Sequence, residues 1–301
     1  MFGVSRATSG IVNLHKPRGM TSRRAVDCVK RLVRPAKVGH AGTLDPLASG
    51  VLVVCVGAAT RLIAYVQAMP KRYIGTFLLG RESDTEDIEG EVRVVAGARQ
   101  PSEEELRAAA ASFVGRIEQR PPVYSALKVA GRRAYELARS GQPVELVPRP
   151  VVIHRIDVVR YEFPELVLDV ECGSGTYLRS LGRDLAAAVG TTAVMSALVR
   201  TRVGSFTLED ARLPDELAPT ALAEWLRPPL DALGQLARVA VTEPEIERLR
   251  HGLAIADRSG SQREEAVGEE VAAVDDRNNL VAILVRKGDS TLRPVRNFSN
   301  R

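Results

Sequence analysis

Apolar positions in the first half of the chain follow strand-like and helix-like spacings in turn. Residues 11–14 form a short apolar run, and apolar residues at helical spacing after Thr21 predict a helix that ends at about Val33. The continuous apolar run 51–56 is typical of a buried strand, and another strand is expected at 73–79. The segment 37–49, between the helix and the buried strand, is expected to be a loop that runs into that strand.

The second half is dominated by strand patterns. Ser102 and the glutamates after it form a capping box that opens a helix to about residue 114. Strands are predicted at 151–159, 166–172 and 205–208, and a helix at 177–189. Several strands with few helices predict an α+β fold with a mixed, largely antiparallel sheet flanked by helices and loops, rather than a doubly wound α/β fold.

The pattern changes after about residue 236. A short helix at 244–252 and strands at 271–274 and 280–285 predict a small β domain over 236–301, beside a larger domain over 1–235. Residues 119–148 contain two consecutive prolines and several basic residues, with a short helix expected at 133–140. Such a segment is typical of a loop that projects from a core.

Charge is concentrated in two places. The net charge is +5 and the isoelectric point is about 9.3. Residues 16–37 carry eight Lys or Arg side chains against one Asp, and a second basic cluster lies within 116–139. A polyanionic partner is favoured by this distribution, although a solvated protein face would have the same composition.

Several classes of site have no support in the sequence. The three cysteines form no CxxC pair, the longest apolar run (51–59) is too short to cross a bilayer, and the N-terminus lacks the core of a signal peptide, so a cytoplasmic protein is expected. The histidines lack metal-ligand spacing, and no phosphate-binding glycine motif is complete, so no metal and no cofactor are expected. The acidic segment 82–91 lacks the register of a calcium loop and is interpreted as a solvated turn.

The segment 39–50, with the sequence GHAGTLDPLASG, is the densest candidate for chemistry. Glycines allow close approach of the backbone to a ligand, and Pro46 restricts Asp45 to an extended conformation. A carboxylate on a loop that enters a buried strand is well placed for catalysis. Asp45 could equally be a turn residue, since Asp-Pro is a common turn signal.

This segment resembles the catalytic motif of the TruB-type tRNA pseudouridine synthases. Further similar segments follow in the order of that family, so that the resemblance covers about residues 9–210: they are 10–22, 71–90, 119–139, 172–179 and 198–201. The C-terminal stretch loosely resembles the small PUA-like domain of the family. One departure is His15, where the family usually has an acidic residue, which puts any local salt bridge or loop packing there in doubt.

The resemblance implies that uridine 55 in the T loop of tRNA is flipped out and isomerised to pseudouridine. This reaction conserves atoms and electrons, so it needs no redox cofactor. By resemblance Asp45 is the nucleophile, and Arg179 is the cation that keeps it ionised. Tyr73 would stack on the flipped base and take part in proton transfer at C5.

The resemblance also implies a set of binding residues. Tyr177 would support the pocket, Leu198 would form an apolar wall, and His40 would fill the stack that the target base leaves. Phosphate contacts are expected from Lys16, Lys128 and Arg132. The expected partner is the T arm of tRNA, bound by a monomer that needs no obligate protein partner.

Three other functions are considered. A non-catalytic RNA-binding or tRNA-folding protein would share the basic clusters, but it would not need Asp45, Tyr73 and Arg179 together. A guide-RNA-dependent synthase of the archaeal and eukaryotic type is opposed by the sequence 46–50 and by the loop 119–148. A carboxylate hydrolase would need a second acidic residue in register, and none stands out.

Overall fold

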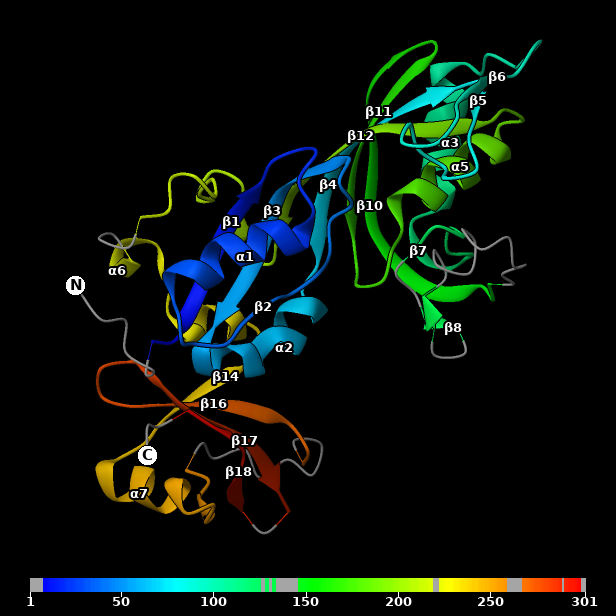
Figure 1. The fold of residues 1–301 in the computed structure, drawn as a ribbon. Coiled ribbons are helices and arrows are strands. Elements are labelled where there is room, and N and C mark those ends of the chain that lie inside the picture. Colours follow the sequence, from blue (N-terminus) through cyan, green and yellow to red (C-terminus); the bar gives the residue numbers. More distant parts are fainter. Residues whose placement is uncertain are drawn as a thin grey trace.

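The computed structural model describes residues 8–125, 128–129, 132–133, 146–218, 222–258, 267–288 and 290–298. Its centre is a nine-stranded sheet in the order β1-β3-β12-β4-β11-β10-β7, with β2 paired to β3 and β13 paired to β12 (Figure 1). Its strands are β1 (Gly10–Lys16), β2 (Val38–His40), β3 (Ala48–Val56), β4 (Lys71–Leu79), β7 (Gly115–Gln119), β10 (Arg149–Glu162), β11 (Glu165–Cys172), β12 (Ala193–Val203) and β13 (Phe206–Thr207).

The pairing of this sheet confirms the expected fold class. Only β3 and β12 run parallel, and the other neighbouring strands are antiparallel. Two small hairpins lie outside it: β5 (Arg81–Glu82) with β6 (Arg93–Val94), and β8 (Lys128–Val129) with β9 (Arg132–Arg133). The α+β prediction is therefore correct.

Helices cover the sheet and complete its cores. α1 (Ser22–Leu32) buries Ala25, Val26 and Val29 against β1 and β3, and the Thr21 side chain caps its first turn. α3 (Glu103–Ser112) and α5 (Leu178–Ala188) pack over β4, β10 and β11 in a second core. The other helices within the described residues are short: η1 (Gly57–Leu62), α2 (Ile63–Ala68), α6 (Leu222–Trp225), η3 (Pro229–Leu233) and α7 (Glu243–Arg250).

The C-terminal strands form a sheet of their own below the central one (Figure 1). Its order is β14-β16-β17-β18-β15, with β14 (Ala237–Ala240), β15 (Ile255–Ala256), β16 (Glu270–Val274), β17 (Leu280–Lys287) and β18 (Thr291–Asn297). Ala272, Leu280 and Ile283 of this sheet share a buried cluster with Ile11 and Val51. The two sheets therefore lie against each other through apolar side chains.

Several elements differ from the sequence-based expectation. Strand β12 lies at the centre of the main sheet, yet 193–203 was not predicted as a strand, and α2, β14 and β18 were also not predicted. Arg133 belongs to strand β9 rather than to a helix, and residues 134–140 of that expected helix lie outside the described residues. Within the described ranges no helix has the length and apolarity needed to cross a membrane.

Candidate active site

A cavity of about 530 Å³ opens where the two halves of the central sheet meet. It is bounded by the loop that carries Asp45, by the start of β4, by the segment that leads into α5, and by β12. Asp45, Tyr73, Tyr177, Arg179 and Leu198 all line it. Five of the nine side chains expected in the site are thus brought together from four separate parts of the chain.

The loop of Asp45 is anchored on both sides. The Ser22 hydroxyl donates to the Leu44 carbonyl and accepts from the Leu44 amide, each at 2.9 Å. The Gly19 amide donates to the Pro46 carbonyl at 2.7 Å, and Leu44 and Leu47 are buried in the core. The Asp45 side chain itself is 42% exposed. The backbone is therefore fixed while the carboxylate stays open to the cavity.

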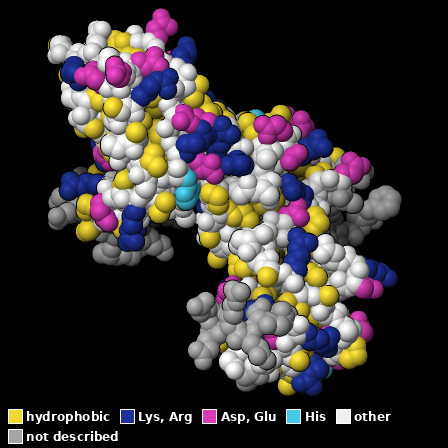
Figure 2. All heavy atoms as spheres, turned by 180° about the vertical axis from the view of Figure 1, so that it is seen from behind, with side chains coloured by type: hydrophobic (Ala, Val, Ile, Leu, Met, Phe, Trp, Pro, Cys, Tyr) yellow, Lys and Arg dark blue, Asp and Glu magenta, His cyan; other side chains and the backbone are white. Residues whose placement is uncertain are grey.

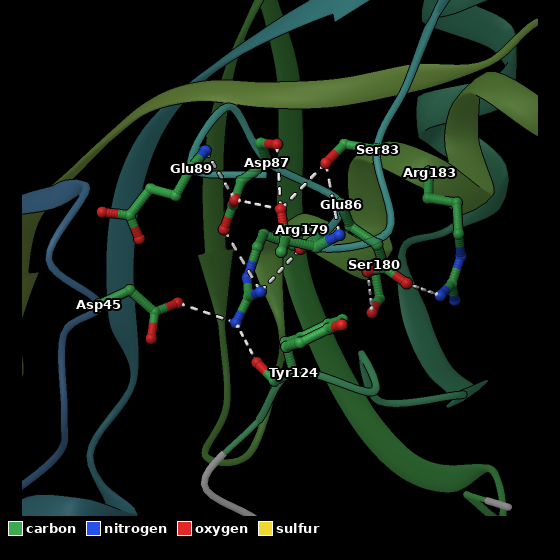
Figure 3. A network of polar contacts seen from close by, with 10 residues as sticks. Asp45, Ser83, Glu86, Asp87, Glu89, Tyr124, Arg179, Ser180 and Arg183 are labelled. Carbon is green, nitrogen blue, oxygen red and sulfur yellow. Dashed lines mark hydrogen bonds and ion pairs between the residues drawn. The ribbon is translucent and has the colours of Figure 1, made fainter. Parts of the chain in front are cut away.

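Arg179 is the main cation facing Asp45 (Figure 3). Its side chain is buried, and Nη2 lies 3.0 Å from Asp45 Oδ2 while Nη1 lies 3.3 Å from Asp87 Oδ2. The guanidinium also donates to the carbonyls of Thr85 (2.8 Å) and Tyr124 (3.0 Å). Arg179 is thus no surface helix residue, since four oxygen atoms fix its orientation.

Part of the acidic segment 82–91 packs against the site, so its interpretation as a solvated turn is wrong for Glu86 and Asp87, while Asp84 is exposed. Asp87 is 2% exposed, and its Oδ1 accepts hydrogen bonds from the Thr85 hydroxyl (2.6 Å) and the Glu89 amide (3.0 Å). Glu86 accepts from the Ser180 hydroxyl at 2.9 Å and pairs with Arg183. Arginines from α5 neutralise these carboxylates, which the local sequence could not reveal.

Tyr73, Leu198 and Tyr177 form other parts of the wall. The Tyr73 side chain is buried on β4, and burial raises the pKa of its phenol while the Arg200 guanidinium opposes that rise. Leu198 is also buried, on β12. Gln119 holds the backbone of Tyr177 by accepting from its amide at 2.8 Å and donating to its carbonyl at 3.1 Å. The cavity wall thus combines apolar side chains with a backbone segment fixed by Gln119.

The remaining expected residues lie elsewhere. His40 is in β2 beside β3, is not part of the cavity wall, and burial lowers the pKa of its ring. The prediction that Lys16 contacts phosphate is corrected, because its side chain is fully buried and its ammonium donates to the carbonyls of Pro17 (3.0 Å) and Met20 (2.6 Å). Lys128 and Arg132 lie in β8 and β9, and their side chains are outside the described residues.

Two cavity-lining cations were assigned no role from the sequence. Lys71 is 7% exposed and donates to the carbonyls of Gln67 and Met69, and Arg200 is 2% exposed and donates to the carbonyls of Val51 and Gly42. Alternation along β4 could have placed Lys71 on the same face as Tyr73, since every second residue of that strand is buried.

The site offers a carboxylate paired with a buried guanidinium, an aromatic surface and an apolar wall. A nearby cation favours the ionised form of a carboxylate, which is the form able to act as a nucleophile. The described residues contain no group of three or more His, Cys, Asp or Glu side chains placed to hold a metal ion. The arrangement can therefore support nucleophilic or electrostatic catalysis by a carboxylate.

Comparison with known proteins identifies close relatives. Residues 30–178 match a family model described as the TruB family pseudouridylate synthase N-terminal domain. The tRNA pseudouridine synthase B of Arthrobacter sp. strain FB24 is 43% identical, with 93% of this chain and 94% of that protein covered. That of Dehalococcoides mccartyi strain BAV1 is 40% identical, with 96% of each chain covered.

Among solved structures, the chain is similar to one in the crystal structure of a Cbf5-Nop10-Gar1 complex. The TM-score is 0.73 at 25% identity, and the similarity covers 98% of this chain and 87% of the other. The fold of the whole chain, including the C-terminal sheet, therefore has a known counterpart.

Proposed function

The chain belongs to the TruB family of pseudouridylate synthases, and on that premise we propose that it converts uridine 55 in the T loop of tRNA to pseudouridine. It is an isomerase of the kind that modifies tRNA. The observation that carries the proposal for this site is the 3.0 Å contact of Arg179 with Asp45 inside the cavity.

The proposed chemistry needs a carboxylate that stays ionised next to the sugar. The N1–C1′ bond of the uridine breaks, the base turns, C5 joins C1′ and loses its proton, and N1 gains a proton. Asp45 is the proposed nucleophile, and its carboxylate forms an ion pair with the Arg179 guanidinium. No cofactor enters the proposed reaction, since atoms and electrons balance without one.

The target nucleotide has to leave the folded loop before it can react. Enzymes that act on a base inside a folded nucleic acid extrude it into a pocket. Tyr73 is proposed to stack on the extruded base, with Leu198 of the neighbouring strand as an apolar wall and Tyr177, immediately before α5, as a further part of the pocket. His40, on β2 just before the catalytic loop, is proposed to occupy the place that the base leaves.

Binding of the T arm is proposed to use two basic regions. The first is the solvent-exposed side of α1 and the turn after it, which carries Arg23, Arg24, Lys30, Arg31, Arg34 and Lys37. The second is the loop 119–148, where Lys128 and Arg132 lie, and whose ends are joined by the pairing of Gln119 with Arg149. On the face shown in Figure 2, basic and acidic side chains are interspersed, so a uniformly positive surface is not expected there.

The proposed domain division is 1–235 and 236–301, supported by the separate five-stranded sheet at the C-terminal end.

The non-catalytic alternative gives no reason for a buried arginine that binds two carboxylates at the cavity. A guide-RNA-dependent role has less support, because the relatives of 40% identity and more are named tRNA pseudouridine synthase B. Action as a monomer and location in the cytoplasm remain predictions.

The test is the conversion of a single nucleotide in unmodified tRNA. A tRNA transcript is incubated with the protein without added cofactor, and pseudouridine is located by carbodiimide treatment and primer extension. A new stop at position 55, absent when that uridine is replaced by cytidine, is the expected result. A stop at another position would overturn the assignment of the target, and no stop with RNA still bound would favour the binding-only function.

A further inference from the structure

Two buried cations of the cavity lack a carboxylate partner. Arg200 and Lys71 form no ion pair with any described residue, and main-chain carbonyls accept their hydrogen bonds. Both line the cavity, from the paired strands β12 and β4. The cavity therefore has one end with uncompensated positive charge.

Two arginines near this end of the cavity do have carboxylate partners. Arg179 meets two carboxylates in the same cavity, and Arg202, two residues beyond Arg200 on β12, pairs with Glu171 at 3.0 Å while remaining 40% exposed. Buried charges are ordinarily paired, because an unpaired charge loses its hydration without a compensating partner. A pair of unmatched cations facing a substrate cavity therefore points to an anion that forms or binds there.

The position of these cations indicates which anion it is. Arg200 lies directly opposite Tyr73 in the pairing of β12 with β4, and Lys71 is two residues before Tyr73 on the same face of β4. The cations therefore adjoin the surface on which the base is proposed to stack, rather than the exposed mouth of the cavity where phosphates would lie.

We propose that Arg200 and Lys71 stabilise the negative charge that the uracil ring acquires during the reaction; this rests on the proposed function. When the N1–C1′ bond breaks, its electron pair leaves with N1, and the resulting anion is delocalised over N1, O2 and O4. If Asp45 instead adds to C6 of the base, the charge appears at O4 as an enolate. In both routes the ring is negatively charged before C5 bonds to C1′. That bond uses an electron pair of the ring, after which C5 loses its proton and N1 gains one.

The geometry suits such a role because the cations are fixed before the substrate arrives. Arg200 Nε and Nη2 donate to the carbonyls of Val51 (2.7 Å) and Gly42 (3.1 Å), and the ammonium of Lys71 donates to that of Met69 (2.5 Å). Charges that are already oriented stabilise a developing anion without reorganisation in the transition state. Burial lowers the pKa of Lys71 to about 8, so the ammonium is still mostly protonated at neutral pH.

The test compares two target nucleotides whose base rings differ in how well they stabilise a negative charge. Single-turnover loss of the N-glycoside is measured after digestion to nucleosides, for T-arm stem-loops carrying either uridine or 5-fluorouridine at the target position. Fluorine at C5 stabilises the anionic ring by itself. Arg200→Met and Lys71→Met remove a cavity cation, Arg200→Lys retains one, and Arg202→Met removes a cation that pairs with Glu171 outside the cavity.

Removal of the Arg200 charge is expected to lower the single-turnover rate on uridine by about a hundredfold, and the rate on 5-fluorouridine by clearly less. Lys71→Met should also slow the reaction of uridine more than that of 5-fluorouridine, with a smaller loss on both. Arg200→Lys should recover part of the rate on uridine. Arg202→Met should react with both nucleotides at the rates of the unchanged protein. Equal losses on both nucleotides in both Met variants, with the melting temperature retained, would overturn the proposal in favour of a merely structural role.

The two Met variants keep the test decisive if one fails to fold, since Lys71 and Arg200 bind different parts of the backbone. Failure of the proposed function is separately visible, because the unchanged protein would then convert neither nucleotide.

Discussion

The guanidinium of Arg179 joins Asp45 and Asp87, with N–O distances of 3.0 and 3.3 Å. The two carboxylates come from separate loops, between β2 and β3 and between β5 and β6, and Asp87 is buried while Asp45 faces the cavity. Arg179 therefore connects the proposed nucleophile to a fixed anion in the protein interior. This arrangement determines where the Arg179 charge lies when no substrate is bound.

Replacement of Arg179 by lysine should remove most activity. An ammonium keeps the charge, but it cannot reach two carboxylates and two carbonyls in the planar geometry of a guanidinium. We expect the single-turnover rate to fall by roughly a hundredfold or more with RNA affinity changed little. Arg202→Lys is the matched control on β12 and should react normally. A fully active Arg179→Lys variant would contradict the role given to this residue.

Asp87→Ala should destabilise the protein. The substitution leaves Arg179 buried with one carboxylate fewer, and removal of one partner of a buried pair costs about 3–5 kcal/mol. Asp84, three residues earlier, has a side chain that is 81% exposed, so Asp84→Ala should change the free energy of unfolding by less than about 0.5 kcal/mol. Urea denaturation of both variants measures the difference. Similar values for the two would show that Asp87 has no structural importance.

Lys16 should make stability depend on pH above neutrality. Burial lowers its pKa in the folded protein to about 8 from the ordinary value of 10.5. Between these values the unfolded chain binds the proton more than the folded chain does, so the free energy of unfolding should rise with pH in this window. Below pH 8 the ammonium is protonated in both states and this gain is absent.

Comparison with Lys16→Met isolates this effect, since Lys71 titrates in both proteins. The stability of the unchanged protein relative to the variant should increase between pH 8 and pH 10, as measured by urea denaturation. A constant difference across that range would show that the Lys16 pKa is not lowered by folding.

RNA binding should weaken with salt, and α1 should contribute to that dependence. Arg24, Lys30 and Arg34 are exposed and form no ion pair with a described residue. Each phosphate contact adds about 0.7–0.9 to the slope of log affinity against log salt. Joint replacement of the three by alanine should lower that slope by about 2, measured by filter binding at several salt concentrations. Arg107→Ala, at the exposed Arg107–Glu103 pair of α3, is the control, and a slope unchanged by the triple substitution would exclude this surface.

The proposed catalytic residues could be anticipated from the sequence because each lies in a short motif that resembles the family. The apolar run 51–56 likewise predicted the buried strand β3. Strand β12 could not be anticipated, since its partners β3 and β4 are over a hundred residues away and it carries buried Arg200 among apolar positions.

Predictions from the local density of charge were wrong where residues distant in sequence, or main-chain carbonyls, set the environment of a side chain. The segment 82–91 has the composition of a solvated turn, but Arg179 and Arg183 from α5 neutralise its buried carboxylates. Lys16 belongs to a basic stretch, yet its ammonium donates hydrogen bonds to two nearby carbonyls in the turn that precedes α1. Neither partner can be recognised from the order of charges along the chain.

The central claim, that Asp45 is the nucleophile of a cofactor-free isomerisation, is tested most directly by release of the C5 hydrogen. A T-arm stem-loop with tritium at C5 of the target uridine is incubated with the unchanged protein and with Asp45→Asn, which keeps the size of the side chain. Tritium released to water by the unchanged protein and none by the variant is the predicted result. Equal release by both would contradict the role of Asp45 while leaving the activity intact.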